Sequence, residues 1–181
     1  MLSVGSKAPE FSLKAQDGKT YSLKKLAGKR AVLYFYPKDD TPGCTIESCG
    51  FRDHNAQFIR AGAQILGISA DDAKSHGKFA LKYGLNFPLL ADMGAKVCKK
   101  YGVWKEKNFL GRKFMGIERT TFLINGQGRI AAIFPKVNPL GHAKGMLSVL
   151  SMIKDKAVSA PKANSRKLPA KKSNPPSKRN H

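Results

Sequence analysis

Two cysteines five residues apart, Cys44 and Cys49, are the side chains of this sequence with the clearest chemical potential. Cys44 follows an apolar run and a turn that contains proline and glycine, so it falls near the expected first turn of a helix. Unpaired backbone N–H groups and the positive end of the helix dipole favour a thiolate over a thiol at such a position. We therefore expect Cys44 to be a nucleophile.

The spacing of the two cysteines restricts how they can react with each other. Five residues along a regular helix separate the Cα atoms of Cys44 and Cys49 by about 8.6 Å. A disulfide needs Cα atoms closer than about 7 Å. A Cys44–Cys49 disulfide therefore requires the first helical turns to unwind, and the spacing predicts redox chemistry coupled to local unfolding.

The elements that must position these cysteines alternate between strands and helices. Apolar runs predict strands at 31–36, 64–69, 120–124 and 129–134, and a smaller hairpin from 11–13 and 20–23. The glycine-rich segment 125–128 predicts that the strands on either side of it form an antiparallel hairpin. Helices are expected at 45–60, 72–83, 95–101 and 141–156. This order predicts an α/β fold with a mixed central sheet flanked by helices.

Length and composition predict one folded unit with a short appendage. The chain has 181 residues, of which 41% are hydrophobic, so a buried core is expected. From 159 to 181 there are seven Lys or Arg, four prolines and no acidic residue. Such a segment has too little apolar surface to offset the entropy of ordering. We expect a folded domain at 1–156 and a disordered basic tail at 157–181.

The charge of +21 favours association with polyanions, and +14 remains after the seven charges of the tail are subtracted. The tail resembles segments that coat DNA or direct a protein to the nucleus, and a solvated extension without a partner is the alternative. The longest apolar run has six residues, and the first residues lack a basic stretch followed by an apolar one. These patterns predict no membrane span and no secretory signal. We expect a cytoplasmic protein, with a nuclear or nucleoid location as the alternative.

The segment around Cys44 is similar to a known family. Pro37-x-x-x-Thr41-x-x-Cys44 resembles the active-site signature of the peroxiredoxins, and the additional Cys49 resembles their bacterioferritin-comigratory, or Q-type, subfamily. The segments 35–45, 101–104 and 116–124 also resemble that subfamily. The likeness extends over about residues 3 to 155 and does not include the tail.

This resemblance implies a thioredoxin-like fold and a thiol-dependent peroxidase, active in antioxidant defence, that reduces hydrogen peroxide and organic hydroperoxides. By resemblance, Cys44 forms a sulfenic acid, Cys49 resolves it as an intramolecular disulfide, and thioredoxin or a related dithiol reduces the disulfide. The resemblance also implies a monomer without metal or organic cofactor. It assigns the remaining site roles to Thr41 near the sulfur, to Pro37 and Pro42 shaping the pocket, and to Arg119 as the positive charge.

Other functions fit parts of the sequence. A basic binding module with incidental thiols is one, and a disulfide reductase is another, although its usual C-x-x-C motif is missing. A zinc site would use Cys44, Cys49 and His54, but structural zinc sites favour shorter gaps between ligands.

For the remaining histidines, Cys98 and several aromatic residues, the sequence favours structural roles. We expect His76 and His142 to face solvent or lie in loops, and His54 to be structural. Cys98 is interpreted as a core or boundary residue, with a second resolving role as the alternative. The aromatic residues between the basic side chains of 104–114 are expected to pack into the core or the pocket rather than to stack on bases.

Overall fold

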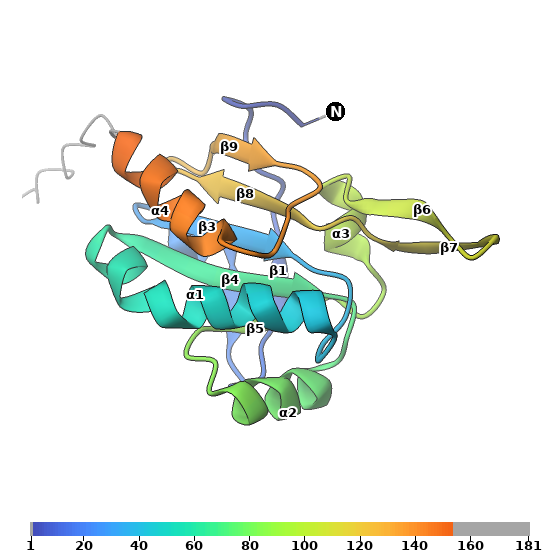
Figure 1. Cartoon of the computed structure of the whole chain (residues 1–181). Helices are drawn as coiled ribbons and strands as arrows, with labels where there is room; N and C mark the ends of the chain where they lie inside the picture. Colours follow the sequence, from blue (N-terminus) through green and yellow to red (C-terminus); the bar gives the residue numbers. More distant parts are fainter. Residues whose placement is uncertain (1, 154–181) are drawn as a thin grey trace, which may run out of the picture.

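The computed structural model describes residues 2–153, which form one α/β unit (Figure 1). The predicted tail at 157–181 lies outside the described residues. In the described part of the chain, no helix combines the length and the apolar character that a membrane crossing demands. The helices and strands occur in the order β1 (Ser12–Lys14), β2 (Thr20–Ser22), η1 (Leu23–Leu26), β3 (Arg30–Phe35), α1 (Pro42–Arg60), β4 (Ala63–Ser69), α2 (Ala73–Tyr83), β5 (Leu89–Ala91), α3 (Lys96–Lys100), β6 (Trp104–Phe109), β7 (Arg112–Ile117), β8 (Thr120–Ile124), β9 (Ile130–Phe134) and α4 (His142–Met152).

The central sheet is mixed, as the sequence predicts. Its strand order is β5-β4-β3-β8-β9, with β3, β4 and β5 parallel and β8 antiparallel to both β3 and β9. Strand β3 is buried over five of its six residues because layers of structure cover both faces of the sheet. The carboxyl ends of β3 and β4 lead into α1 and α2, at the edge where α/β folds place their functional sites.

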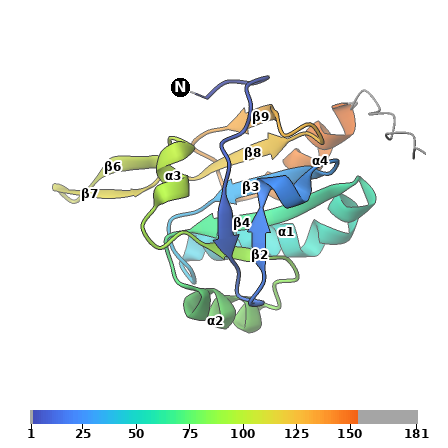
Figure 2. The ribbon, with the colours of Figure 1, turned by 180° about the vertical axis from the view of Figure 1, so that it is seen from behind.

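Two apolar clusters occupy the two faces of the sheet. Helices α1, α2 and α4 cover one face, where Phe51, Phe79 and Met146 belong to the same buried cluster (Figure 1). The other face carries β1, β2, η1 and α3, as Figure 2 shows from behind. Cys44 belongs to the first cluster and Cys98 to the second, so the sheet separates the two thiols.

The predicted elements are confirmed with shifted ends. All four predicted central strands and both predicted hairpins are present. Helix α1 begins at Pro42, three residues earlier than predicted, because proline suits the first helical position, where no N–H is needed. Helix α4 ends at Met152 rather than at 156, since the backbone of Ile153 is extended. The sequence pattern did not predict β5, the turn η1, or the hairpin of β6 and β7.

The β6–β7 hairpin projects from the body of the molecule, at the end of the sheet where α1 begins (Figure 1). Its strands pair in antiparallel register from Trp104 opposite Ile117 to Phe109 opposite Arg112. The expectation that its aromatic residues pack into a core is wrong for Phe109, which is 68% exposed, and for Phe114, which is 49% exposed. Two strands alone have no second layer against which these rings could be buried.

Candidate active site

The start of α1 positions Cys44. Thr41 is the N-cap residue, with extended backbone and no hydrogen bond from its side chain to the helix, and Pro42 follows as the first helical residue. Cys44 is therefore the third residue of the helix, where the backbone N–H groups have no partner within the helix. Its side chain is fully buried. The positive end of the helix dipole at this position stabilises a thiolate.

Arg119, just before β8, brings a fixed positive charge to the sulfur. Its Nη2 donates a hydrogen bond to Cys44 Sγ at 3.3 Å, and its Nη1 donates to Glu47 Oε2. Glu47 lies three residues after Cys44 on α1, so both side chains are on the same helix face. The guanidinium thus bridges a buried thiol and a buried carboxylate, which fixes its orientation toward the sulfur.

Glu47 is an unusual partner because it is almost completely buried. Burial raises the pKa of Glu47 to about 7, although the charge of Arg119 and the hydrogen bond from it act in the opposite direction. Its second carboxylate oxygen, Oε1, has no hydrogen-bond partner among the described residues. The carboxyl group therefore holds Arg119 at a cost in desolvation.

Gly43 leaves the space through which Arg119 approaches the helix. A methyl group on the Cα of Gly43 would lie 3.2 Å from Arg119 Nη2 and 3.7 Å from Pro139 Cγ. A side chain at this position would therefore press on the nitrogen atom that contacts the sulfur.

Lys107 on β6 adds a second positive charge near the site. Burial lowers the pKa of Lys107, and so does the nearby charge of Arg119, whereas Glu118 and Cys44 act in the opposite direction. Lys107 is therefore within electrostatic range of both Arg119 and Cys44. Together these groups can stabilise negative charge on an oxygen atom that leaves a substrate.

Comparisons with known proteins agree with this geometry. Residues 4–133 match the model of the AhpC/TSA family. A putative peroxiredoxin bcp of Coxiella burnetii is 54% identical over 141 residues, which cover 78% of this chain and 93% of that protein. The peroxiredoxin Bcp of Bacillus subtilis is 44% identical over 155 residues, which cover 86% of this chain and 99% of that protein. The chain is a Q-type peroxiredoxin of the AhpC/TSA family.

Solved structures support the fold of this peroxiredoxin. The bacterioferritin comigratory protein of Xanthomonas campestris, studied for its alkyl peroxide reduction activity, aligns with a TM-score of 0.77 and 39% identity, covering 84% of this chain and 97% of that one. A Cys-to-Ser mutant of the PrxQ protein of Xylella fastidiosa aligns with a TM-score of 0.80 and 36% identity. The alignment covers 84% of this chain and 97% of that one. The fold is therefore thioredoxin-like, and the peroxiredoxin is a peroxidase.

The structure brings some of the predicted site residues together. Arg119 contacts Cys44, and Cys49 lies half-buried further along the same intact helix. The Thr41 hydroxyl donates to the Lys38 carbonyl at 3.0 Å, so its role at the sulfur stays a prediction. Pro37 is exposed in the turn before α1, and its role in the pocket also stays a prediction.

Three residues of the site were missed by sequence reasoning: Glu47, Gly43 and Lys107. The signal for Glu47 was its spacing of three residues from Cys44, which places two ionisable side chains on one helix face. Gly43 and Lys107 gave no local signal, because their roles depend on Arg119, which is distant in sequence.

The expectation for the two histidines is wrong. His76 is completely buried in α2. His142 begins α4, is half-buried, and its Nε2 lies 2.9 Å from the Thr121 hydroxyl. Burial lowers the pKa of His142 to about 4, assisted by the charge of Arg119. His54 contacts the Gly50 carbonyl one turn earlier in its own helix, which agrees with a structural role.

The prediction that Cys98 is a core residue is confirmed. Its side chain is fully buried, and burial raises the pKa of its thiol. Its backbone N–H donates to Asp92 Oδ2 at 2.8 Å. A thiol in this environment is a poor nucleophile.

Proposed function

We propose that this peroxiredoxin reduces hydrogen peroxide and organic hydroperoxides through Cys44 and is regenerated by thioredoxin or a related dithiol. The observation that carries the proposal is the contact of 3.3 Å between Arg119 Nη2 and Cys44 Sγ. The Cys44 thiolate attacks one peroxide oxygen and the O–O bond breaks. The sulfur becomes a sulfenic acid, and the other oxygen leaves as water or an alcohol after taking a proton. Arg119 stabilises the charge that develops on the leaving oxygen.

Cys49 is the resolving thiol in this proposal. It attacks the Cys44 sulfenic acid, the sulfur–sulfur bond forms, and one water molecule leaves. In the folded helix the two Cα atoms are about 8.6 Å apart, so the first turns of α1 unwind before the bond forms. The same unwinding exposes the buried Cys44 sulfur, which a protein reductant must reach. Cys98 is a weak alternative because it lies across the sheet from α1.

The proposed setting is the cytoplasm, where dithiol carriers are kept reduced, and the proposed catalytic unit is the monomer. The test is turnover of hydrogen peroxide coupled to thioredoxin and its reductase, for the wild type and for Cys44→Ser, Cys49→Ser and Cys98→Ser. We expect no turnover without Cys44, loss of repeated turnover without Cys49, and normal turnover without Cys98. Full turnover of Cys49→Ser would assign resolution to another thiol.

A further inference from the structure

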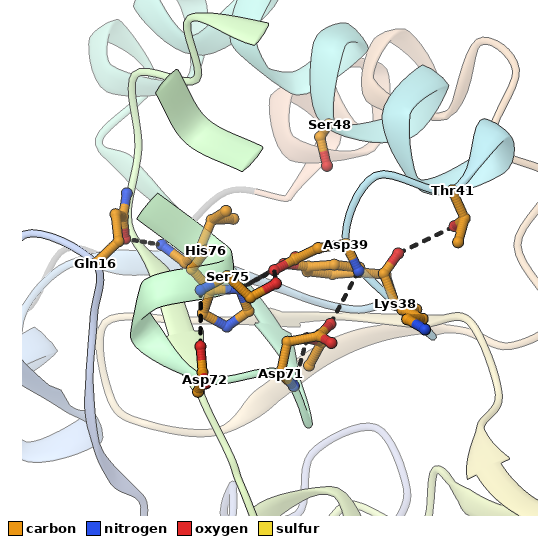
Figure 3. A network of polar contacts seen from close by, with 12 residues as sticks. Gln16, Lys38, Asp39, Thr41, Ser48, Asp71, Asp72, Ser75 and His76 are labelled. Carbon is orange, nitrogen blue, oxygen red and sulfur yellow. Dashed lines mark hydrogen bonds and ion pairs between the residues drawn. The ribbon is translucent and has the colours of Figure 1, made fainter. Parts of the chain in front are cut away.

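The turn between β3 and α1 is held by a buried polar network that the peroxidase chemistry does not use directly. This turn runs from Tyr36 to Thr41 and carries Asp39 at its centre, where the residue is only 7% exposed. Figure 3 shows the Asp39 side chain between the end of β3 and the start of α2. The turn leads directly into the helical residues that must unwind for resolution.

Asp39 is bound by residues from three segments of the chain. Its Oδ1 accepts from the Tyr36 hydroxyl at 2.7 Å, and its Oδ2 accepts from the Ser75 hydroxyl at 2.7 Å. His76 Nδ1 lies 2.8 Å from Oδ2. The backbone N–H of Asp39 donates to Asp71 Oδ2 at 2.9 Å. These contacts fasten the turn to the segment after β4 and to α2, and the Tyr36 contact joins the two ends of its first half.

The buried position of His76 makes its contact with Asp39 important. Its side chain is completely buried, and its Nε2 has no hydrogen-bond partner among the described residues. A buried imidazole with one unpaired nitrogen costs free energy unless its other nitrogen gains a strong interaction. That interaction is with the Asp39 carboxylate, and it is charge-assisted.

The outer side of the same turn has a weaker attachment to α2. Lys82 Nζ and the Tyr83 hydroxyl contact the carboxylate of Asp40 at 2.7 and 2.6 Å. The Asp40 side chain is 42% exposed and that of Lys82 is 58% exposed, so solvent screens this pair. The buried contacts of Asp39 therefore stabilise the turn more than the exposed contacts of Asp40 do.

We propose that Asp39 and His76 form a latch: their contact stabilises the turn between β3 and α1 in its folded form. The latch thereby opposes the unwinding of α1 and slows disulfide formation. This inference rests on the proposed Cys44–Cys49 cycle. The contacts of Asp39 hold the folded start of α1, in which Cys44 meets Arg119, and weakening them favours the unwound form, in which Cys44 meets Cys49. Asp39 and His76 are positioning residues, since neither touches the reacting sulfur among the contacts of the structure.

The test measures the lifetime of the Cys44 sulfenic acid. Reduced full-length protein is mixed with one equivalent of hydrogen peroxide, quenched at intervals with a sulfenic-acid trap, and analysed by intact mass. His76→Phe keeps a buried ring but removes the nitrogen that meets Asp39. We expect its sulfenic acid to convert to the disulfide about tenfold faster, the scale of one charge-assisted hydrogen bond. Less sulfinic acid should then form in excess peroxide.

Three control variants separate the latch from a general loss of stability. His76→Asn places an amide donor near the position of Nδ1 and should restore slow resolution. Lys82→Met removes the exposed contact on the same helix and should change the rate less than about twofold. Ile130→Ala lowers the stability of the core on the other face of the sheet and should leave the rate of resolution unchanged.

The outcomes distinguish the two proposals. Equal or slower resolution in His76→Phe would overturn the latch and leave the peroxidase cycle standing. Faster resolution in Ile130→Ala as well would also overturn it, because any loss of stability would then suffice. Absence of sulfenic acid and disulfide in every variant, the wild type included, would instead contradict the proposed function.

Discussion

Replacing Arg119 with Met removes a positive charge that lies 3.3 Å from the Cys44 sulfur. At an effective dielectric constant of ~20, a unit charge at this distance interacts with a thiolate by about 5 kcal/mol, which sets the ceiling of the effect. Solvent and the helix dipole compensate part of this loss. We therefore expect the second-order rate constant for hydrogen peroxide to fall by about 100- to 1,000-fold, the usual result of removing one charge-stabilising donor.

The same substitution removes the cation that lowers the pKa of the buried Glu47, so this pKa rises further and the carboxyl group is protonated over a wider pH range. The protein also loses the stability that the buried ion pair supplied. Loss of activity and loss of stability must therefore be separated. The double variant Arg119→Met/Glu47→Gln replaces the orphaned carboxyl group with a neutral amide, so most of the stability should return while the rate stays low.

The assay is competition for hydrogen peroxide with a haem peroxidase of known rate constant, at pH 8, with urea unfolding measured on the same samples. Recovery of the rate together with stability in the double variant would show that Arg119 acts only by holding the fold. An Arg119→Met variant with the rate of the wild type would refute the electrostatic role of Arg119 altogether.

Three further predictions concern Glu47, Gly43 and the basic tail. Burial raises the pKa of Glu47 in the folded state to about 7, from its ordinary value of 4.5. Between pH 4.5 and 7 the folded state therefore keeps a proton that the unfolded state loses. The free energy of unfolding should consequently fall by about 3 kcal/mol as the pH rises through this range. In Glu47→Gln, the free energy of unfolding measured in urea should not fall over this pH range. An equal fall in the variant would show that Glu47 does not cause it. Gly43→Ala should raise the melting temperature through helix propensity and lower the peroxide rate about tenfold by pressing on Arg119; an unchanged rate would mean that Arg119 adapts. Deletion of 159–181, with seven basic residues, should weaken duplex DNA binding and flatten its salt dependence, and equal affinity of the truncated protein would exclude the tail as a DNA contact.

The sequence predicted the central sheet because its strands are continuous apolar runs, as in Ala31–Tyr36, whose burial on both faces leaves a strong local pattern. The β6–β7 hairpin was missed because its strands carry Lys, Glu and Asn among the aromatic residues and are mostly exposed. Their pairing depends on register between strands, which the composition of one segment does not show.

The functional residues also divide into those that the local sequence could predict and those that it could not. Cys44 and Cys49 were recognisable because the local segment carries both the helix start and the spacing. His76 was placed on the surface by default, since its partner Asp39 lies 37 residues away. A buried histidine of this kind is justified only by a contact that the fold creates, so local sequence could not reveal it.

In the proposed cycle, Cys44 and Cys49 form one disulfide through a Cys44 sulfenic acid. The most direct measurement is the intact mass of the reduced protein after one equivalent of hydrogen peroxide, for the wild type and for Cys49→Ser. We predict a loss of about 2 Da in the wild type and a gain of about 16 Da in Cys49→Ser, the masses of a disulfide and a sulfenic acid. A loss of about 2 Da in Cys49→Ser, or no mass change in the wild type, would contradict the Cys44–Cys49 cycle.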